Sequence, residues 1–303
     1  MGQTCAEARR VGEMAVTSEI IIEPLPATLG ATVRGIRLAT LDDAEWRVIE
    51  NAFNTYALLI FPGQHLSDDE QLAFGRRFGQ LEKGLTLAPI SNITPEGDVR
   101  PADGVVMQML RGNEGWHTDS SYMPLSAKAS MLSAHVVPSS GGDTEWADMR
   151  AAYEALDDET RARIASLSAF HSIRYSQAQL GFTDVVNGSY GYDVEDPPLR
   201  PLVKVHPVTA RPALYIGRHA HAIPGLDADD SRQLLAELLE FACKPPRTYR
   251  HHWTPGDIAV WDNRCVLHHA CTYDYGEPRV MKHTRVSGEA TEVAPHCGYT
   301  TAS

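Results

Sequence analysis

Short runs of apolar or alternating residues, bounded by Gly, Pro, Asn or Asp, recur along the chain and are typical of strands. The predicted strands are residues 20–22, 30–36, 58–61, 107–110, 130–137, 143–147, 202–206, 213–216, 258–261 and 280–288. The first two and the pair 202–216 are spaced as hairpins. Residues 82–105, rich in Pro, Gly and Asn, are predicted as an irregular loop.

Helical spacing of apolar residues is confined to fewer stretches, which are 42–56, 67–79, 149–156, 158–166 and 227–243. Ser67 followed by Glu70 is the pattern of a capping box at a helix start. Strands spread over the whole chain with helices between them predict one continuous β-rich fold. We therefore expect a single domain at 19–290, a loose extension at 1–18 and a tail at 291–303.

The composition of the 303 residues narrows the classes of partner. A formal net charge of -12 argues against nucleic acid or an anionic membrane as the main partner. No apolar run reaches the roughly 18 residues of a membrane helix, and residues 1–18 lack the apolar core of a signal peptide. The five cysteines form no CxxC pair, which predicts neither a disulfide framework nor a cysteine zinc site. We expect a cytoplasmic protein, and the sequence leaves homo-oligomers open.

The first candidate chemistry is the H-x-D segment of His117 and Asp119. On an extended strand these two side chains would point to the same face and bind one ion together. An imidazole and a carboxylate are two-thirds of the facial triad that holds non-haem Fe(II). The missing histidine occurs far along the chain, where His268 and His269 follow Trp-Asp-Asn-Arg. Adjacent strand residues face opposite ways, so only one of the two can be a ligand.

These pieces resemble the TauD/TfdA family of Fe(II)- and 2-oxoglutarate-dependent dioxygenases, whose pattern is H-x-D, a long interval, and a histidine after W-D-N-R. The resemblance implies a double-stranded β-helix (jelly roll) core with flanking helices, with Fe(II), 2-oxoglutarate and O2 as cofactor and cosubstrates. It makes His268 the third metal ligand and places 2-oxoglutarate on Arg279, on Thr144 of a G-G-D-T turn, and near Asn113.

Within the family, residues 58–67, 149–153, 198–207 and 216–225 look most like the aryloxyalkanoate dioxygenases that act on (S)-phenoxypropionates and 2,4-D. This likeness implies hydroxylation of a small anionic organic substrate, followed by cleavage of its ether. A sulfonate, an alkyl sulfate or a natural-product intermediate are alternative substrates. A catalytically silent metal-binding protein is another alternative, which intact cosubstrate residues argue against.

The final strand suggests how an acidic substrate is recognised. Arg279, His283 and Arg285 fall on one face of a regular strand, whereas Lys282 faces away. We predict that Arg285, assisted by His283, binds the substrate carboxylate. Further candidates for the pocket are Tyr122, Arg218 and His219, although histidines near a strand end are often structural. Residues 247–252 look like a solvated basic patch, and Trp261 like core packing beside the metal.

Overall fold

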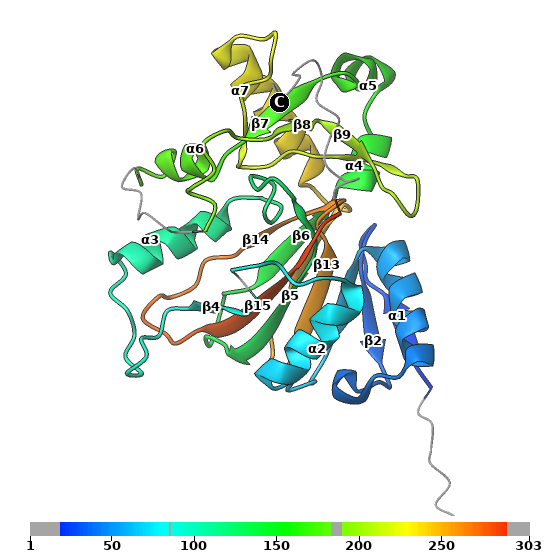
Figure 1. Ribbon diagram of the computed structural model, residues 1–303, viewed down its shortest axis with the longest axis vertical. Coiled ribbons are helices and arrows are strands. Elements are labelled where there is room, and N and C mark those ends of the chain that lie inside the picture. Colours follow the sequence, from blue (N-terminus) through cyan, green and yellow to red (C-terminus); the bar gives the residue numbers. More distant parts are fainter. Residues whose placement is uncertain (1–18, 85, 183–189, 290–303) are drawn as a thin grey trace, which may run out of the picture.

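The computed structural model describes residues 19–84, 86–182 and 190–289 (Figure 1). The predicted extension 1–18 and the tail 291–303 lie outside these residues. The largest sheet has seven strands in the order β1-β2-β3-β13-β5-β15-β4. Their bounds are β1 Ile21–Pro24, β2 Ala31–Arg34, β3 Leu58–Phe61, β13 Ile258–Asp262, β5 Ala127–Val136, β15 Val280–Ser287 and β4 Ala88–Ser91. All pairs are antiparallel except β2 with β3.

A smaller sheet of β12 Thr248–His251, β6 Thr144–Asp148 and β14 Val266–Ala270 packs against the inner face of the large one. Trp146 of β6 and Trp261 of β13 meet there with ring centroids 5.8 Å apart. The two sheets form a mainly β, jelly-roll core.

The period of two along the central strands sends alternate residues to two separate apolar clusters. In β13, Ala259 and Trp261 point inward between the sheets, whereas Ile258 and Val260 point outward. In the neighbouring strand β5, Met131 points outward. Because both faces of the large sheet are buried, a polar side chain on the inner face is enclosed by protein rather than exposed to solvent.

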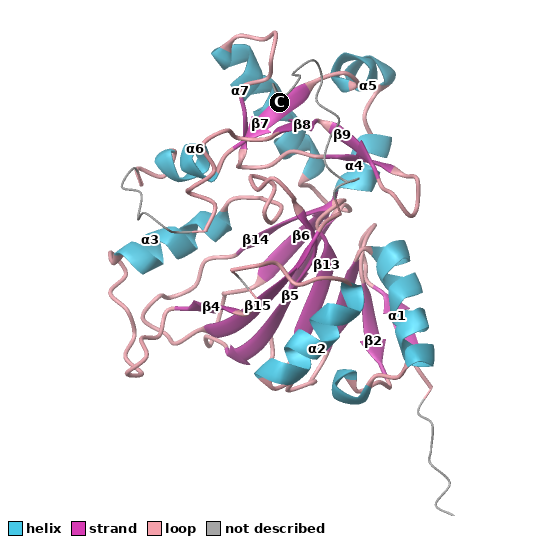
Figure 2. Ribbon diagram, viewed as in Figure 1, coloured by secondary structure: helices cyan, strands magenta, loops and turns pink. Residues whose placement is uncertain are grey.

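Two helices, α1 Asp43–Tyr56 and α2 Asp68–Phe78, lie along the outer face of the large sheet (Figure 2). Both begin with a capping box, formed by Asp42 with Glu45 and by Ser67 with Glu70. Gly79 ends α2, as the sequence predicts.

The chain between β6 and β12 forms a separate layer, drawn at the top of Figure 1. It holds α4 Met149–Glu154, α5 Asp158–Ile164, β7 Ser168–His171, α6 Ile173–Ala178, β8 Leu199–Pro201, β9 Val203–Val205, β10 Pro212–Leu214, β11 Ala220–His221 and α7 Ala228–Ala242. The predicted hairpin is present as β9 paired with β10. Within the described residues, no helix is long and apolar enough to cross a membrane.

Several predictions of local structure were wrong. Residues 107–110 are not a strand but part of helix α3, Val105–Arg111, which the favourable helix propensities of Met, Gln and Leu explain. The predicted loop 82–105 contains β4, an edge strand paired with β15. Strands β7, β8, β11 and β12 were missed. The basic patch at 247–252 is also wrong for His251, which is largely buried and paired with Asp257 at 3.0 Å.

The H-x-D segment does not lie in a regular strand. His117 forms a single bridge to His268 of β14, with backbone N–H to O distances of 2.9 and 2.8 Å. The chain turns immediately afterwards, and Ser120 adopts a left-handed φ of 54°. Convergence of His117 and Asp119 therefore depends on this turn and on the contacts of Asp119, not on a long strand.

Candidate metal centre and cosubstrate pocket

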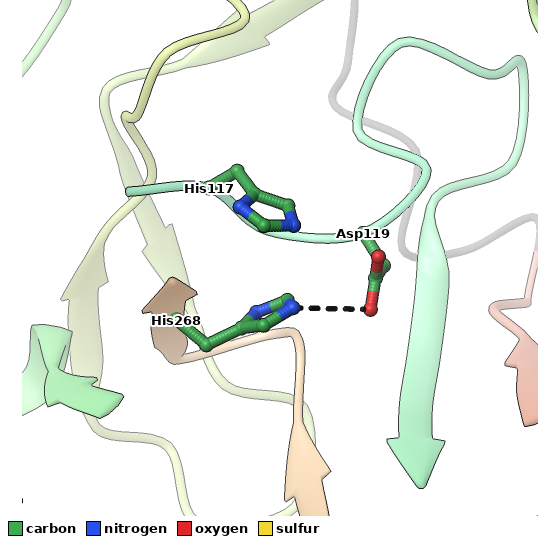
Figure 3. A group of neighbouring side chains, drawn as sticks. All are labelled: His117, Asp119 and His268. Carbon is green, nitrogen blue, oxygen red and sulfur yellow. Dashed lines mark ion pairs between the residues drawn. The ribbon is translucent and has the colours of Figure 1, made fainter. Parts of the chain in front are cut away.

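Three side chains converge between the two sheets: His117, Asp119 and His268 (Figure 3). One ligand atom from each lies within 4.8 Å of the others, and all three residues are buried. His268 Nε2 is 3.6 Å from Asp119 Oδ2, and the rings of His117 and His268 are 4.1 Å apart. Two imidazole nitrogens and one carboxylate form a donor set that fits a divalent non-haem iron.

Both histidines are in the form that binds metal. Burial lowers the pKa of His117 well below its usual value, and lowers the pKa of His268 to about 4. Both rings are therefore neutral at pH 7. The Nδ1–H of His117 donates to the carbonyl of Gly115 at 2.8 Å, which leaves Nε2 as the ligand atom. The Trp261 ring packs at a tilt against His268, with ring centroids 4.6 Å apart, and walls the site.

Asp119 is held as a carboxylate by surrounding donors. Burial alone would raise its pKa, but the Arg285 guanidinium at 2.9 Å from Oδ1 holds that pKa well below its usual value. Ser130 Oγ, on the inner face of β5, donates to Oδ2 at 2.7 Å. Asn263 in turn donates to Ser130 at 2.8 Å, and its own Oδ1 accepts from Trp261 Nε1 at 3.1 Å.

The remaining residues of the W-D-N-R motif fix the turn between β13 and β14. Asp262 accepts from Arg264 Nε at 2.8 Å and Nη2 at 2.7 Å, and lies 2.9 Å from His206 Nε2. All three are buried. The motif therefore orients the ligand Asp119 through Asn263 and also fixes the turn that leads into the strand carrying His268.

A cavity of about 50 Å³ adjoins the triad. The predicted cosubstrate residues Asn113, Thr144 and Arg279 line it together with His117, Asp119 and His268. Thr144 Oγ1 accepts from Trp253 Nε1 at 3.0 Å, so its own hydroxyl hydrogen is available for an acceptor in the cavity. A buried guanidinium and a hydroxyl facing one cavity suit a carboxylate.

Arg279 is positioned by the backbone of the G-G-D-T turn. Its Nε and Nη2 donate to the carbonyl of Gly142 at 3.2 and 3.0 Å, and its own N–H donates to Asn92 Oδ1 at 2.7 Å. Gly142 has φ +67°, and a Cβ there would lie 3.1 Å from Arg279 Nε. A side chain at this position would therefore be strained by the positive φ and would crowd both Pro138 and the guanidinium.

The predicted substrate residues fall into two groups. His283 and Arg285 line the cavity, while Lys282 faces outward and forms an ion pair with Asp68 of α2. Tyr122 and His219 are not among the residues that line the cavity. The ring centroid of His219 is 4.9 Å from that of Tyr122 and 6.0 Å from that of His117.

Arg218, a predicted pocket residue, binds the backbone of neighbouring segments instead. It donates to the backbone carbonyls of Gly112 and Ser176 and packs over Gly115. It therefore supports the loop that carries Asn113 and precedes His117, and it does not line the cavity.

Sequence reasoning missed Ser130, Asn92, Trp253 and the role of Asn263. Asn263 stands in the W-D-N-R motif, so the motif was the available signal. The other three lie in unremarkable stretches, and no pattern in the sequence marks them.

A family model described as "Taurine catabolism dioxygenase TauD, TfdA family" matches residues 21–285. The chain therefore belongs to the TauD/TfdA family of Fe(II)- and 2-oxoglutarate-dependent dioxygenases, and it is an oxidoreductase.

Similar proteins share most of its length. The (S)-phenoxypropionate/alpha-ketoglutarate-dioxygenase of Sphingobium herbicidovorans is 53% identical over 280 residues, covering 90% of this chain and 97% of the relative. The Delftia acidovorans protein of the same description is 52% identical over 276 residues, covering 88% and 94%. A solved structure described as "Crystal structure of AAD-2 in complex with Mn(II) and N-oxalylglycine" superimposes with a TM-score of 0.84 at 40% identity, covering 89% of this chain and 97% of that one. N-oxalylglycine is an analogue of 2-oxoglutarate.

Proposed function

We propose that this protein is an aryloxyalkanoate dioxygenase, which hydroxylates the ether-bearing carbon of a phenoxyalkanoate. The proposal rests on the buried guanidinium of Arg285, which lies beside the candidate metal ligands. Arg285 reaches Asp119 through Nη2, while its buried Nε has no hydrogen-bond partner among the described residues. The similarity to two (S)-phenoxypropionate dioxygenases supports the same substrate class.

His117, Asp119 and His268 would hold Fe(II), which with 2-oxoglutarate and O2 supplies the oxidation of a C–H bond. Arg279 and Thr144 would bind the carboxylate of 2-oxoglutarate remote from the metal, because a guanidinium and a hydroxyl line the cavity beside the triad. Asn113 lines the same cavity as a further polar group. The apolar wall formed by Ile90, Leu132 and Trp261 excludes water around these donors.

The substrate carboxylate would bind Arg285, with His283 beside it. Burial lowers the pKa of Arg285, but Asp119 more than offsets this and raises that pKa above its usual value, so the guanidinium stays charged. His283 Nε2 lies 3.4 Å from Asp119 Oδ2 and faces the same cavity. An anion bound here would place its neighbouring carbon close to the metal ligands, as hydroxylation at that carbon requires.

The products follow from the atom balance. One O2 oxidises 2-oxoglutarate to succinate and CO2 and places one oxygen atom in a C–H bond of the substrate. Hydroxylation of the ether-bearing carbon gives a hemiketal or hemiacetal, in which one carbon carries both the hydroxyl and the aryl ether. Its collapse transfers the hydroxyl proton to the leaving oxygen and releases a phenol and an oxo acid.

The test is a coupled product assay. The protein would be supplied with Fe(II), 2-oxoglutarate and air, together with each enantiomer of 2-phenoxypropionate, phenoxyacetate, taurine or an alkyl sulfate. We expect phenol and succinate in equal amounts from at least one phenoxyalkanoate. Substrate-dependent succinate from taurine or the alkyl sulfate alone would contradict the proposed substrate class while leaving the family chemistry intact.

We further propose a cytoplasmic enzyme with one catalytic domain at 19–290 that needs neither nucleic acid nor a membrane. The described cysteines, Cys243, Cys265 and Cys271, are all free thiols, as a reducing compartment favours. The net charge of -12 supports the absence of polyanionic partners. Proteolysis that leaves a stable, active fragment close to these bounds would support the domain proposal.

A further inference from the structure

A second group of metal-binding side chains lies outside the catalytic pocket. It consists of Glu145 on β6, His269 on β14 and Cys271 just beyond β14, and one ligand atom from each lies within 4.8 Å of the others. His269 follows the candidate iron ligand His268 directly. Their side chains point to opposite sides of β14, so the two groups lie on opposite sides of the same strand.

The backbone brings these three side chains together. His269 is paired with Glu145 across the β6–β14 ladder, and its Nε2 is 3.2 Å from Glu145 Oε2. Cys271 is two residues beyond His269, which returns its side chain to the same face. The Cys271 N–H donates to the carbonyl of Asp143 at 2.8 Å and anchors this end of the strand.

The group is accessible and has a free ligand atom. The side chains of Glu145 and His269 are each 17% exposed, whereas the iron candidates are buried. Arg250 and His269 both contact Glu145 through Oε2, at 3.2 Å each, which leaves Oε1 as the ligand atom. Arg250 would then be the hydrogen-bonding partner that ligating carboxylates usually have.

A third group of possible metal ligands consists of His206, Asp262 and Cys265. All three residues are buried, and Asp262 is already paired with both Arg264 and His206. A metal would have to break a buried ion pair to bind there, which is costly. The partly exposed group is therefore the one open to an ion from solution.

We propose that Glu145, His269 and Cys271 form a second metal site, which takes a borderline-soft divalent ion such as Zn²⁺. One imidazole, one thiolate and one carboxylate with a water molecule complete the tetrahedral set that zinc prefers. Fe(II), or a hard ion that prefers oxygen ligands, would instead favour the sulfur-free site of His117, Asp119 and His268. The bound ion would join β6 to the end of β14.

Cobalt(II) is the probe, because thiolate ligation of Co²⁺ gives a near-ultraviolet charge-transfer band that oxygen and nitrogen ligands do not give. The metal-free full chain would be titrated anaerobically with Co²⁺. We expect two equivalents to bind, with the thiolate band belonging to the second site. Asp119→Ala should remove one equivalent and keep the band, because the catalytic group contains no sulfur.

Cys271→Ser should remove the band and the second equivalent, while Glu145→Gln should keep the thiol but weaken this binding at least tenfold. Cys243→Ser is the matched control, since Cys243 is another half-buried free thiol close enough for Glu145 to act on its pKa. Circular dichroism would verify the fold of each variant, and the Fe(II)–2-oxoglutarate absorption band would verify the catalytic site of the Cys271, Glu145 and Cys243 variants. Absence of the band in the unmodified protein, or its survival in Cys271→Ser, would overturn the proposal.

Discussion

Replacing Ser130 with alanine tests how the fold orients the candidate metal ligand. Ser130 Oγ donates to Asp119 Oδ2 at 2.7 Å and accepts from Asn263 Nδ2 at 2.8 Å. The Ser130→Ala variant keeps all three candidate metal ligands, His117, Asp119 and His268. It removes one charge-assisted hydrogen bond to the carboxylate and leaves a buried amide hydrogen without its acceptor.

Ser130→Ala loses both hydrogen bonds of the Ser130 hydroxyl, to Asp119 and from Asn263. A hydrogen bond to a charged group contributes roughly 1.5–3 kcal/mol, which corresponds to about a 10- to 150-fold change in a binding constant. Loss of a partner that orients a metal ligand typically weakens metal affinity about 10- to 100-fold. We therefore expect Fe(II) affinity to fall by at least about tenfold in Ser130→Ala.

The assay is an anaerobic Fe(II) titration in the presence of 2-oxoglutarate, followed by the charge-transfer absorption of the complex. Ser133→Ala is the matched control, because Ser133 lies on the same strand but donates outward to Gln71 of α2 at 2.6 Å. That variant should lose about 0.5–1.5 kcal/mol of stability with unchanged iron affinity. Equal iron affinities in Ser130→Ala and the unmodified protein would refute the orienting role.

His268→Ala should abolish iron binding, whereas His269→Ala should retain it, and iron retained only in His268→Ala would reverse the ligand assignment. Arg285→Ala should raise the Michaelis constant for an acidic substrate at least tenfold, or about 1.4 kcal/mol. Lys282→Ala, on the outward face, should change that constant little. Equal increases in the two variants would show that Arg285 does not bind the substrate. Burial lowers the pKa of His171 well below its usual value, so the unfolded chain takes up a proton there below about pH 6.5 and stability falls with acidification. His171→Phe should reduce the slope of unfolding free energy against pH, between about pH 6 and 4.5, by up to about 1.4 kcal/mol per pH unit. Urea titrations of the metal-free protein would measure this slope. An unchanged slope would show that His171 titrates normally.

Local patterns predicted the parts of this fold whose causes are local. The helix predicted to start at residue 42, the capping box at Ser67 and the apolar strand 58–61 agree with the structure because each depends on neighbours within a few residues. Residues 107–110 were assigned wrongly because a short apolar run fits a strand and a helix equally well. The edge strand β4 was missed because it exists only through its pairing with β15.

In the candidate site, too, the residues of sequence motifs were predictable and the contacts between distant segments were not. Its ligands were predicted because the motif residues have a fixed order in the family, and the structure brings His117, Asp119 and His268 together. Contacts between distant segments were not predictable. The bond from Ser130 to Asp119 and the pairing of Arg285 with the same carboxylate arise only when β5 and β15 lie side by side.

Anomalous diffraction from crystals grown anaerobically with one equivalent of Fe(II) and N-oxalylglycine would locate both the metal and the cosubstrate analogue. We predict one iron peak bounded by His117, Asp119 and His268, with the remote carboxylate of the analogue on Arg279. Iron located elsewhere, for example on Glu145 and its neighbours, or an analogue bound away from Arg279, would contradict it.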